Sequence, residues 1–134
     1  MSRKEVTLKL KKLDERAVIP TYAHVDDDGK NQGDIGMDMT AISVEWDEKM
    51  DCYIYHTGLA IETAKGFGTL LFPRSSNRKT DCYLANSVGL ADSTLYRGEI
   101  LWCFKSRIST YERAEIIGNK AFLNSFFKSL KNPL

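Results

Sequence analysis

Residues 72–100 hold most of the side chains that could do chemistry on a small anionic ligand. Arg74, Ser75 and Ser76 follow a proline at the end of an apolar run, where the chain is expected to turn. A guanidinium, two hydroxyls and the amides of a turn are donors suited to phosphate oxygens. Because Pro-Arg-Ser-Ser also occurs in ordinary surface turns, this block alone does not distinguish an anion site from a capped turn.

A lone carboxylate, Asp92, lies in the same stretch between Gly89 and the run Tyr96-Arg97-Gly98, a composition typical of a β-hairpin. A carboxylate near a phosphate chain is electrostatically unfavourable, so it needs a reason to be there. One reason is to orient a water and accept its proton as the water attacks phosphorus. Tyr96 could cover a flat base, and Asn86 could hydrogen-bond a base edge. Taken singly, each of these residues also fits turn chemistry or strand packing.

Short runs of strand-forming residues, separated by turn residues, surround this stretch and must position it. They cover residues 6–10, 42–46, 52–55, 57–62, 69–72 and 99–104. A further extended piece is expected over residues 16–22, where Pro20 confines it to an edge or a bend. The pattern predicts a mainly β fold, a jelly-roll-like β-barrel. Since no repeat or linker interrupts the chain, we expect residues 1–134 to form a single domain.

The C-terminal stretch has a helical period instead. Phe122, Phe126 and Leu130 recur at i, i+4 and i+8 after a possible cap at Asn119. A helix is therefore predicted over about residues 119–131, with lysines near its C-terminal end. Its apolar face would pack on the barrel or on a neighbouring subunit.

The net charge of +1 disfavours a nucleic-acid-binding surface, which needs a basic bias. No run approaches the roughly 18 apolar residues of a membrane span, and the N-terminus lacks the apolar core of a secretory signal. Three cysteines without close pairing indicate reduced thiols, so we expect a cytoplasmic protein. No membrane or nucleic-acid partner is predicted.

The sequence disfavours two kinds of metal site. His24 and His56 are too widely separated in the sequence to build a zinc-type spacing. The acidic loop at residues 24–34 suggests calcium, but Lys30 stands where the EF-hand pattern needs Asp or Asn. A solvated loop is the favoured interpretation.

Several separate blocks together resemble the trimeric dUTP pyrophosphatase (dUTPase) family. Gly36-Met37-Asp38-Met39 is similar to its first motif, usually Gly-Tyr-Asp-Leu, and residues 72–76 resemble the second. Residues 84–89 and 96–100 resemble the third, while residues 18–23 and 57–60 match flanking strands. The resemblance covers residues 18–104. The fourth motif, Gly-x-Arg-x-Ala-Gln, and the Gly-rich fifth are absent, so the domain is expected to be C-terminally incomplete.

The resemblance implies hydrolysis of dUTP to dUMP and pyrophosphate by a homotrimer with its sites between subunits, in the cytoplasm of a cell or of a phage- or virus-infected host. Asp92 would orient and deprotonate the water that attacks the α-phosphorus. Mg²⁺ would be held mainly by the triphosphate. Asp38 would act either beside the metal's waters or by fixing its own strand.

The same resemblance assigns the substrate-binding groups. Arg74, Ser75 and Ser76 would contact the phosphates. Uracil would be read by Asn86 together with the backbone of Leu90 and Ala91. Tyr96 would pack beneath the deoxyribose and exclude a ribose 2′-hydroxyl.

The sequence departs from the family pattern between its acid and its aromatic. The family spaces them as Asp-x-x-Tyr, whereas one more residue separates Asp92 from Tyr96, and a bulge would have to absorb it. Ala91 replaces the usual branched aliphatic. These departures keep open a non-catalytic nucleotide-binding or protein-interaction subunit on the same fold. The related dCTP deaminases are disfavoured, because residues 100–104 lack the glutamate that their chemistry needs.

Overall fold

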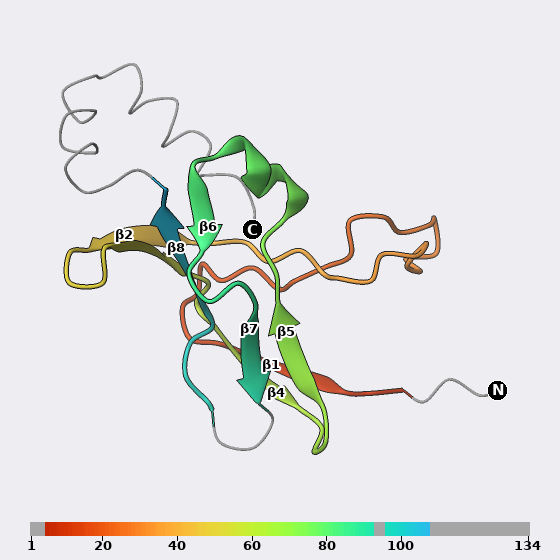
Figure 1. Ribbon diagram of the computed structural model, residues 1–134. Helices are drawn as coiled ribbons and strands as arrows, with labels where there is room; N and C mark the ends of the chain where they lie inside the picture. The colour runs from red at the N-terminus through yellow and green to blue at the C-terminus, as the bar shows by residue number, and fades with distance from the viewer. Residues whose placement is uncertain (1–4, 93–95, 108–134) are drawn as a thin grey trace.

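Eight short β-strands and one 3-10 helix form the part of the chain that the computed structural model describes, residues 5–92 and 96–107 (Figure 1). The strands are β1 (Leu8–Lys12), β2 (Ser43–Asp47), β3 (Cys52–His56), β4 (Leu59–Thr63), β5 (Gly68–Leu71), β6 (Cys82–Leu84), β7 (Gly89–Asp92) and β8 (Leu101–Ser106), and the helix is η1 (Ser75–Lys79). The prediction of a mainly β fold is confirmed. The helix predicted over about residues 119–131 lies outside the described residues.

The strands pair into three antiparallel sheets. The largest sheet has the order β2-β3-β8-β6, and two-stranded sheets are formed by β1 with β4 and by β5 with β7. A two-stranded ladder is marginally stable alone in water. Each of the two small sheets therefore depends on packing against the rest of the core.

The core is built where apolar residues of β3, β4 and β8 face each other. Tyr55, Leu59, Trp102 and Phe104 are all buried, and the rings of Tyr55 and Phe104 meet edge to face at a centroid distance of 5.3 Å. Burial raises the pKa of the Tyr55 hydroxyl. This cluster fixes the inner strands on which the outer ladders rest.

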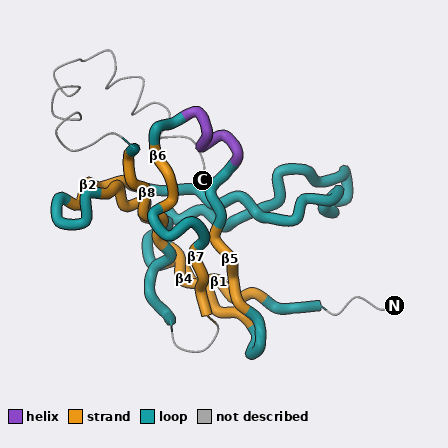
Figure 2. The backbone as a smooth tube through the Cα atoms, in the orientation of Figure 1, coloured by secondary structure: helices purple, strands orange, loops and turns teal. Residues whose placement is uncertain are grey.

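Residues 16–22 are largely irregular. Thr21 makes a single bridge to Asp38, and Val18 and Ile19 are exposed. Proline lacks the N–H that a ladder needs, which explains why Pro20 does not extend this bridge into a strand. The connection from here to β2 extends away from the strands (Figure 2).

None of the three cysteines forms a disulfide. Cys52 and Cys82 are buried and Cys103 is partly buried. Desolvation raises the pKa of the Cys52 thiol, so its proton is retained at neutral pH.

Within the described residues, no helix has the length and apolar character to span a membrane.

Candidate functional site

The ladder between β5 and β7 sets the geometry of the stretch that carries the chemistry. Gly68 lies opposite Asp92 at one end, and Leu71 lies opposite Gly89 at the other. Asp92 is three residues from Gly89 along β7, which corresponds to about 10 Å in a strand. Arg74 follows β5 and Asn86 precedes β7, so both leave from the Leu71 end, whereas Asp92 closes the opposite end (Figure 1).

Arg74 stands at the entrance to η1. Its backbone is extended, with φ −71° and ψ 155°, and its carbonyl accepts a hydrogen bond of 2.9 Å from the Asn77 N–H. Ser75 is exposed and Ser76 partly buried in the first turn of this helix. Arg74 and both hydroxyls thus lie on one tight turn, as the sequence predicts, and the turn is helical.

Asp38 faces the guanidinium of Arg74. The Arg74 Nε lies 3.5 Å from the Asp38 Oδ1, and the Asp38 N–H donates to the carbonyl of Thr21 at 2.8 Å. The carboxylate is therefore held on a fixed strand segment beside the arginine. The bridge to Thr21 fits the alternative in which Asp38 fixes its own segment, whereas the pairing with Arg74 was not predicted from the sequence.

Asn86 lies in a tight turn between β6 and β7. In this turn Ser87 has a φ of 62°, and the Asn86 carbonyl accepts a hydrogen bond from the Val88 N–H at 2.6 Å. The Ala85 N–H donates to Cys103 at 2.8 Å and ties the turn to β8. The side chain of Asn86 is exposed, available to a ligand.

Leu90 and Ala91 lie within β7, opposite Leu70 and Thr69. Leu90 is 62 % exposed, whereas Ala91 is buried. Backbone groups alternate in direction along an antiparallel strand, and β5 is the only strand paired with β7 in the described residues. One of these two residues therefore presents its N–H and C=O to the open edge of β7, where a base could bind.

Tyr96 folds back on the turn that leads to β8. Its hydroxyl donates to the carbonyl of Glu99 at 2.6 Å, and its ring lies over Gly98, where an added Cβ would come 2.8 Å from the Tyr96 oxygen. Asp92 is exposed. The bulge expected between Asp92 and Tyr96 falls on residues 93–95, which lie outside the described residues.

A cleft of about 480 Å³ contains only part of the predicted site. Asp38 and Arg74 line it, together with Met37, Phe72 and Trp102, but Asn86, Asp92 and Tyr96 do not. The structure therefore brings Asp38 and Arg74 together in this cleft and leaves Asn86, Asp92 and Tyr96 outside it.

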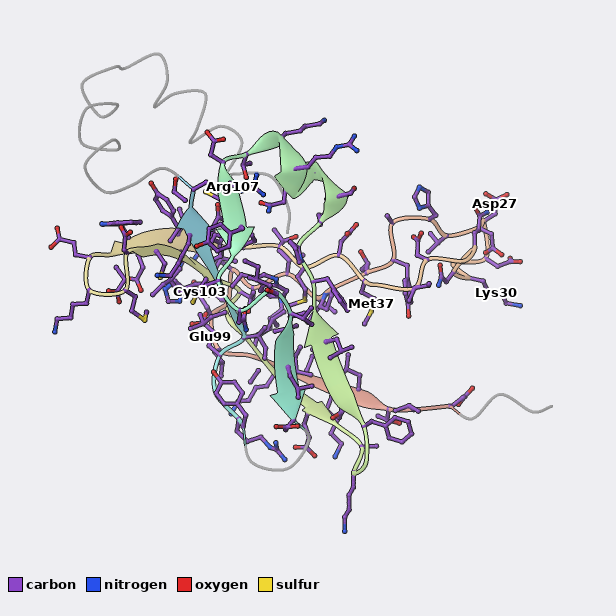
Figure 3. The ribbon with its side chains drawn as sticks, viewed as in Figure 1. Asp27, Lys30, Met37, Glu99, Cys103 and Arg107 are labelled. Carbon is purple, nitrogen blue, oxygen red and sulfur yellow. The ribbon has the colours of Figure 1, made fainter. Side chains whose placement is uncertain are left out.

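Neither metal interpretation gains support from the described residues. They contain no group of three or more His, Cys, Asp or Glu side chains arranged to hold a metal. In the acidic loop, the Asp26 carboxylate accepts the N–H groups of Asp28 and Lys30, while Asp34 accepts from His24. Figure 3 shows Asp27 and Lys30 at the far end of this loop, away from the strands.

Sequence reasoning missed a network around His56. Its Nδ1 lies 2.8 Å from the Glu99 Oε1, and its Nε2 lies 3.0 Å from the Glu45 Oε1. The second oxygen of Glu99 accepts the Gly58 N–H at 2.7 Å. His56 and Glu99 are 43 residues apart and share no motif. Only the pairing of β3 with β8, which sets His56 opposite Leu101, brings them together.

No protein-family model matches the sequence. Among curated proteins, the deoxyuridine 5′-triphosphate nucleotidohydrolase of Trichodesmium erythraeum is 39 % identical over 94 residues, which is 69 % of this chain and 61 % of the relative. The enzyme of the same name from Clostridium novyi is 33 % identical over 94 residues, with the same two shares. The chain thus spans about three fifths of the length of the curated relatives it matches.

Solved structures give the same result. A dUTPase from phage phi11 of S. aureus, described as coordinating a structural Mg(II) ion, aligns with a TM-score of 0.58 and 25 % identity. The alignment covers 75 % of this chain and 60 % of the phage phi11 chain. The dUTPase of Staphylococcus bacteriophage 80alpha, solved with dUpNHpp, aligns with a TM-score of 0.57 and 25 % identity over 74 % of this chain and 53 % of its own.

Proposed function

Because this chain belongs to the dUTPase family over the part it shares with its relatives, we propose that it hydrolyses dUTP to dUMP and pyrophosphate. The observation that carries the proposal is the 39 % identity with a deoxyuridine triphosphate nucleotidohydrolase over 94 residues. The likeness in fold to a dUTPase solved with dUpNHpp supports it further. The nucleotide is the substrate, and no nucleic-acid or membrane partner is part of the proposal.

In the proposed reaction, Asp92 takes the proton of the attacking water. Its carboxylate is exposed at the end of β7, where a ligand and a water can both reach it. Arg74 donates to the phosphates, and its Asp38 partner limits the directions that the guanidinium takes. Holding the water and the phosphate in register supplies the positioning on which phosphoryl transfer depends.

Mg²⁺ is the proposed cofactor. It would neutralise charge on the triphosphate oxygens, and Asp38, the carboxylate beside Arg74, would hydrogen-bond its waters. A hard cation that dehydrates reluctantly would be held mainly by those oxygens and by waters.

We further propose that each site combines residues of different subunits in a homotrimer of single-domain chains. Within one chain the phosphate-binding turn and Asp92 leave opposite ends of the β5–β7 ladder. The outer face of this ladder also exposes Leu70, Phe72 and Leu90. A neighbouring subunit would cover that apolar face and bring its own Asp92 toward Arg74.

A nucleotide-binding subunit without catalysis is the second candidate. The observation that favours it is the additional residue between Asp92 and Tyr96, which alters the spacing of the acid from the sugar-facing ring. An acid displaced by about 1 Å can lose some hundredfold in rate without losing the ligand.

The direct test is Asp92→Asn with dUTP and Mg²⁺, measured by pyrophosphate release. Loss of a general base lowers the rate by at least about 100-fold, so release should nearly cease while dUMP binding, followed by calorimetry, persists. Asp27→Asn is the matched control, since Asp27 is an exposed aspartate on the distant loop (Figure 3); it should behave as the unmodified chain.

Three outcomes separate the candidates. Unchanged release by Asp92→Asn would remove Asp92 from the mechanism. Binding of dUMP without any release by the unmodified chain would favour the second candidate. If the unmodified chain bound neither dUTP nor dUMP, both candidates would be lost.

A further inference from the structure

The turn between β3 and β4 is hydrogen-bonded to the segment that follows Tyr96. The Thr57 hydroxyl donates to the carbonyl of Ile100 at 2.7 Å, and the Ile100 N–H donates to the carbonyl of Leu59 at 2.8 Å. Thr57 and Leu59 are fully buried. The backbone at residue 100 is thereby fixed to the core from both sides.

The side chain of Glu99 adds two further contacts between this segment and the turn. One carboxylate oxygen accepts the Gly58 N–H at 2.7 Å and the other pairs with the His56 Nδ1 at 2.8 Å. The side chains of His56 and Glu99 are only 27 % and 26 % exposed, so this pair is shielded from solvent more than a surface ion pair. Figure 3 shows Glu99 beside the strands.

Tyr96 rests on the residue held in this way. Its hydroxyl donates to the Glu99 carbonyl at 2.6 Å, and its ring covers Gly98. The ring therefore has its position set by Glu99, whose own position is set by Gly58 and His56.

We propose that Glu99 and His56 are positioning residues for Tyr96, and thereby for recognition of the sugar of the nucleotide. This inference rests on the proposed function. Neither residue touches the nucleotide; together they hold the turn against which the Tyr96 ring is placed.

The charge on His56 controls the strength of its interaction with Glu99, and this interaction is the hold on the Tyr96 turn. The groups that face it are Glu99 and, from β2, Glu45, while Asp14 and Arg16 line the same cleft of about 470 Å³. Asp14 is already paired with Arg16, at 2.8 Å, and this hydrogen bond lowers the pKa of Asp14 to about 2. The cleft gives water access to the imidazole.

The hydrogen bond to Glu99, with a smaller contribution from Glu45, raises the pKa of His56 above its ordinary value of 6.5 against the opposing effect of desolvation. A raised pKa means that the charged imidazole is bound more tightly in the folded state. The hold is complete below pH 6.5 and weakens as the pH rises through the raised value.

The test compares Glu99→Gln with Glu45→Gln. Glu99 uses both oxygens as acceptors, whereas a glutamine has one acceptor oxygen and a donor NH2, so it cannot hold the Gly58 N–H and the charged imidazole through separate oxygens. Glu45→Gln is the matched control, because it removes the other carboxylate on His56 but leaves the Glu99 contacts to Gly58 and Tyr96 in place. Thermal unfolding followed by circular dichroism checks that both variants fold.

In the nucleotide arm, binding of dUMP and of UMP is measured by calorimetry between pH 6 and pH 9. Glu99→Gln should weaken dUMP binding by about tenfold and reduce the preference for dUMP over UMP. Glu45→Gln should change both by less. An unchanged preference in folded Glu99→Gln would overturn the proposal.

In the second arm, nucleotide-free protein is titrated by NMR. The His56 ring signals and the Gly98 amide, which lies under Tyr96, should shift with a common midpoint above pH 6.5, and Glu99→Gln should uncouple them. If the Gly98 amide shift does not change as His56 titrates in the unmodified chain, the proposal is overturned. If the unmodified chain binds no nucleotide, the proposed function fails while this arm still decides whether His56 and Glu99 hold Tyr96.

Discussion

At the scale of single residues, the pairing of Arg74 with Asp38 links two blocks that lie far apart in the sequence. The 3.5 Å separation and the partial exposure of both side chains mark a surface ion pair. Such a pair contributes less than about 1 kcal/mol to folding. The pair therefore matters less for stability than for the orientation of the Arg74 guanidinium.

Replacing the two members should give different results. Arg74→Ala removes a charge-assisted donor to phosphate, worth about 1.5–3 kcal/mol, and should weaken dUMP binding by about 10- to 100-fold. Asp38→Asn keeps the donor and should weaken binding less than fivefold or so, with the free energy of unfolding changed by less than about 1 kcal/mol. Calorimetry and urea unfolding measure the two quantities. Equal losses of binding would place Asp38 in contact with the ligand or its metal.

The residue types and their motif spacing were sufficient to predict Arg74, Asn86, Asp92 and Tyr96 as candidates. Their roles remain proposals. The partners that hold them could not be predicted, because the contact of His56 with Glu99 spans 43 residues and depends on strand pairing. A sequence pattern records local periodicity and carries no information on such a long-range register.

At the scale of elements, the turn at Gly58 joins β3 to β4. Its φ is 67°, and an added Cβ would lie 2.8 Å from the Ile42 Cδ1, 3.0 Å from the Asp14 Cβ and 3.2 Å from the Ala17 Cβ. Two separate constraints thus require glycine: the left-handed backbone and the lack of space.

Gly58→Ala should lower the free energy of unfolding by about 2–4 kcal/mol, the sum of backbone strain and overpacking. Gly29→Ala is the matched control: its φ is 77°, but no atom lies within 4 Å of the added carbon. Gly29→Ala should lower the free energy of unfolding by the backbone strain alone, about 1 kcal/mol. Urea unfolding of both variants measures the difference, and equal losses would show that crowding at Gly58 relaxes without cost.

Most strands were predictable because their runs alternate and end at turn residues. The run at residues 57–62 was predicted two residues too early, since Gly58 turns the chain and β4 begins at Leu59. Neither β6 nor β7 was among the predicted strands. A turn with Ser87 at φ 62° divides them, and a positive φ at a residue other than glycine has no reliable sequence signal.

At the scale of the whole molecule, the described residues form a small core with two thin ladders around it. The β5–β7 ladder is the one that carries the proposed chemistry, and Leu70 and Leu90 form an exposed apolar pair across it. Exposed apolar pairs on a marginal ladder are stabilised when another surface covers them. The mainly β architecture was predictable from patterning, whereas this uncovered face was evident only from the pairing.

The placement of Arg74 and Asp92 at opposite ends of one ladder has a genetic consequence. If each site takes its arginine from one chain and its acid from another, two variants that each release little pyrophosphate at low dUTP should restore each other. Refolding Arg74→Ala together with Asp92→Asn in equal amounts would give mixed trimers in which about a quarter of the sites pair an intact Arg74 with an intact Asp92. Pyrophosphate release at low dUTP should recover to about that fraction, while each variant refolded alone stays well below it. Continued inactivity of well-mixed trimers would mean that both residues serve the same chain's site, and the two mutations would then behave as alleles that never complement.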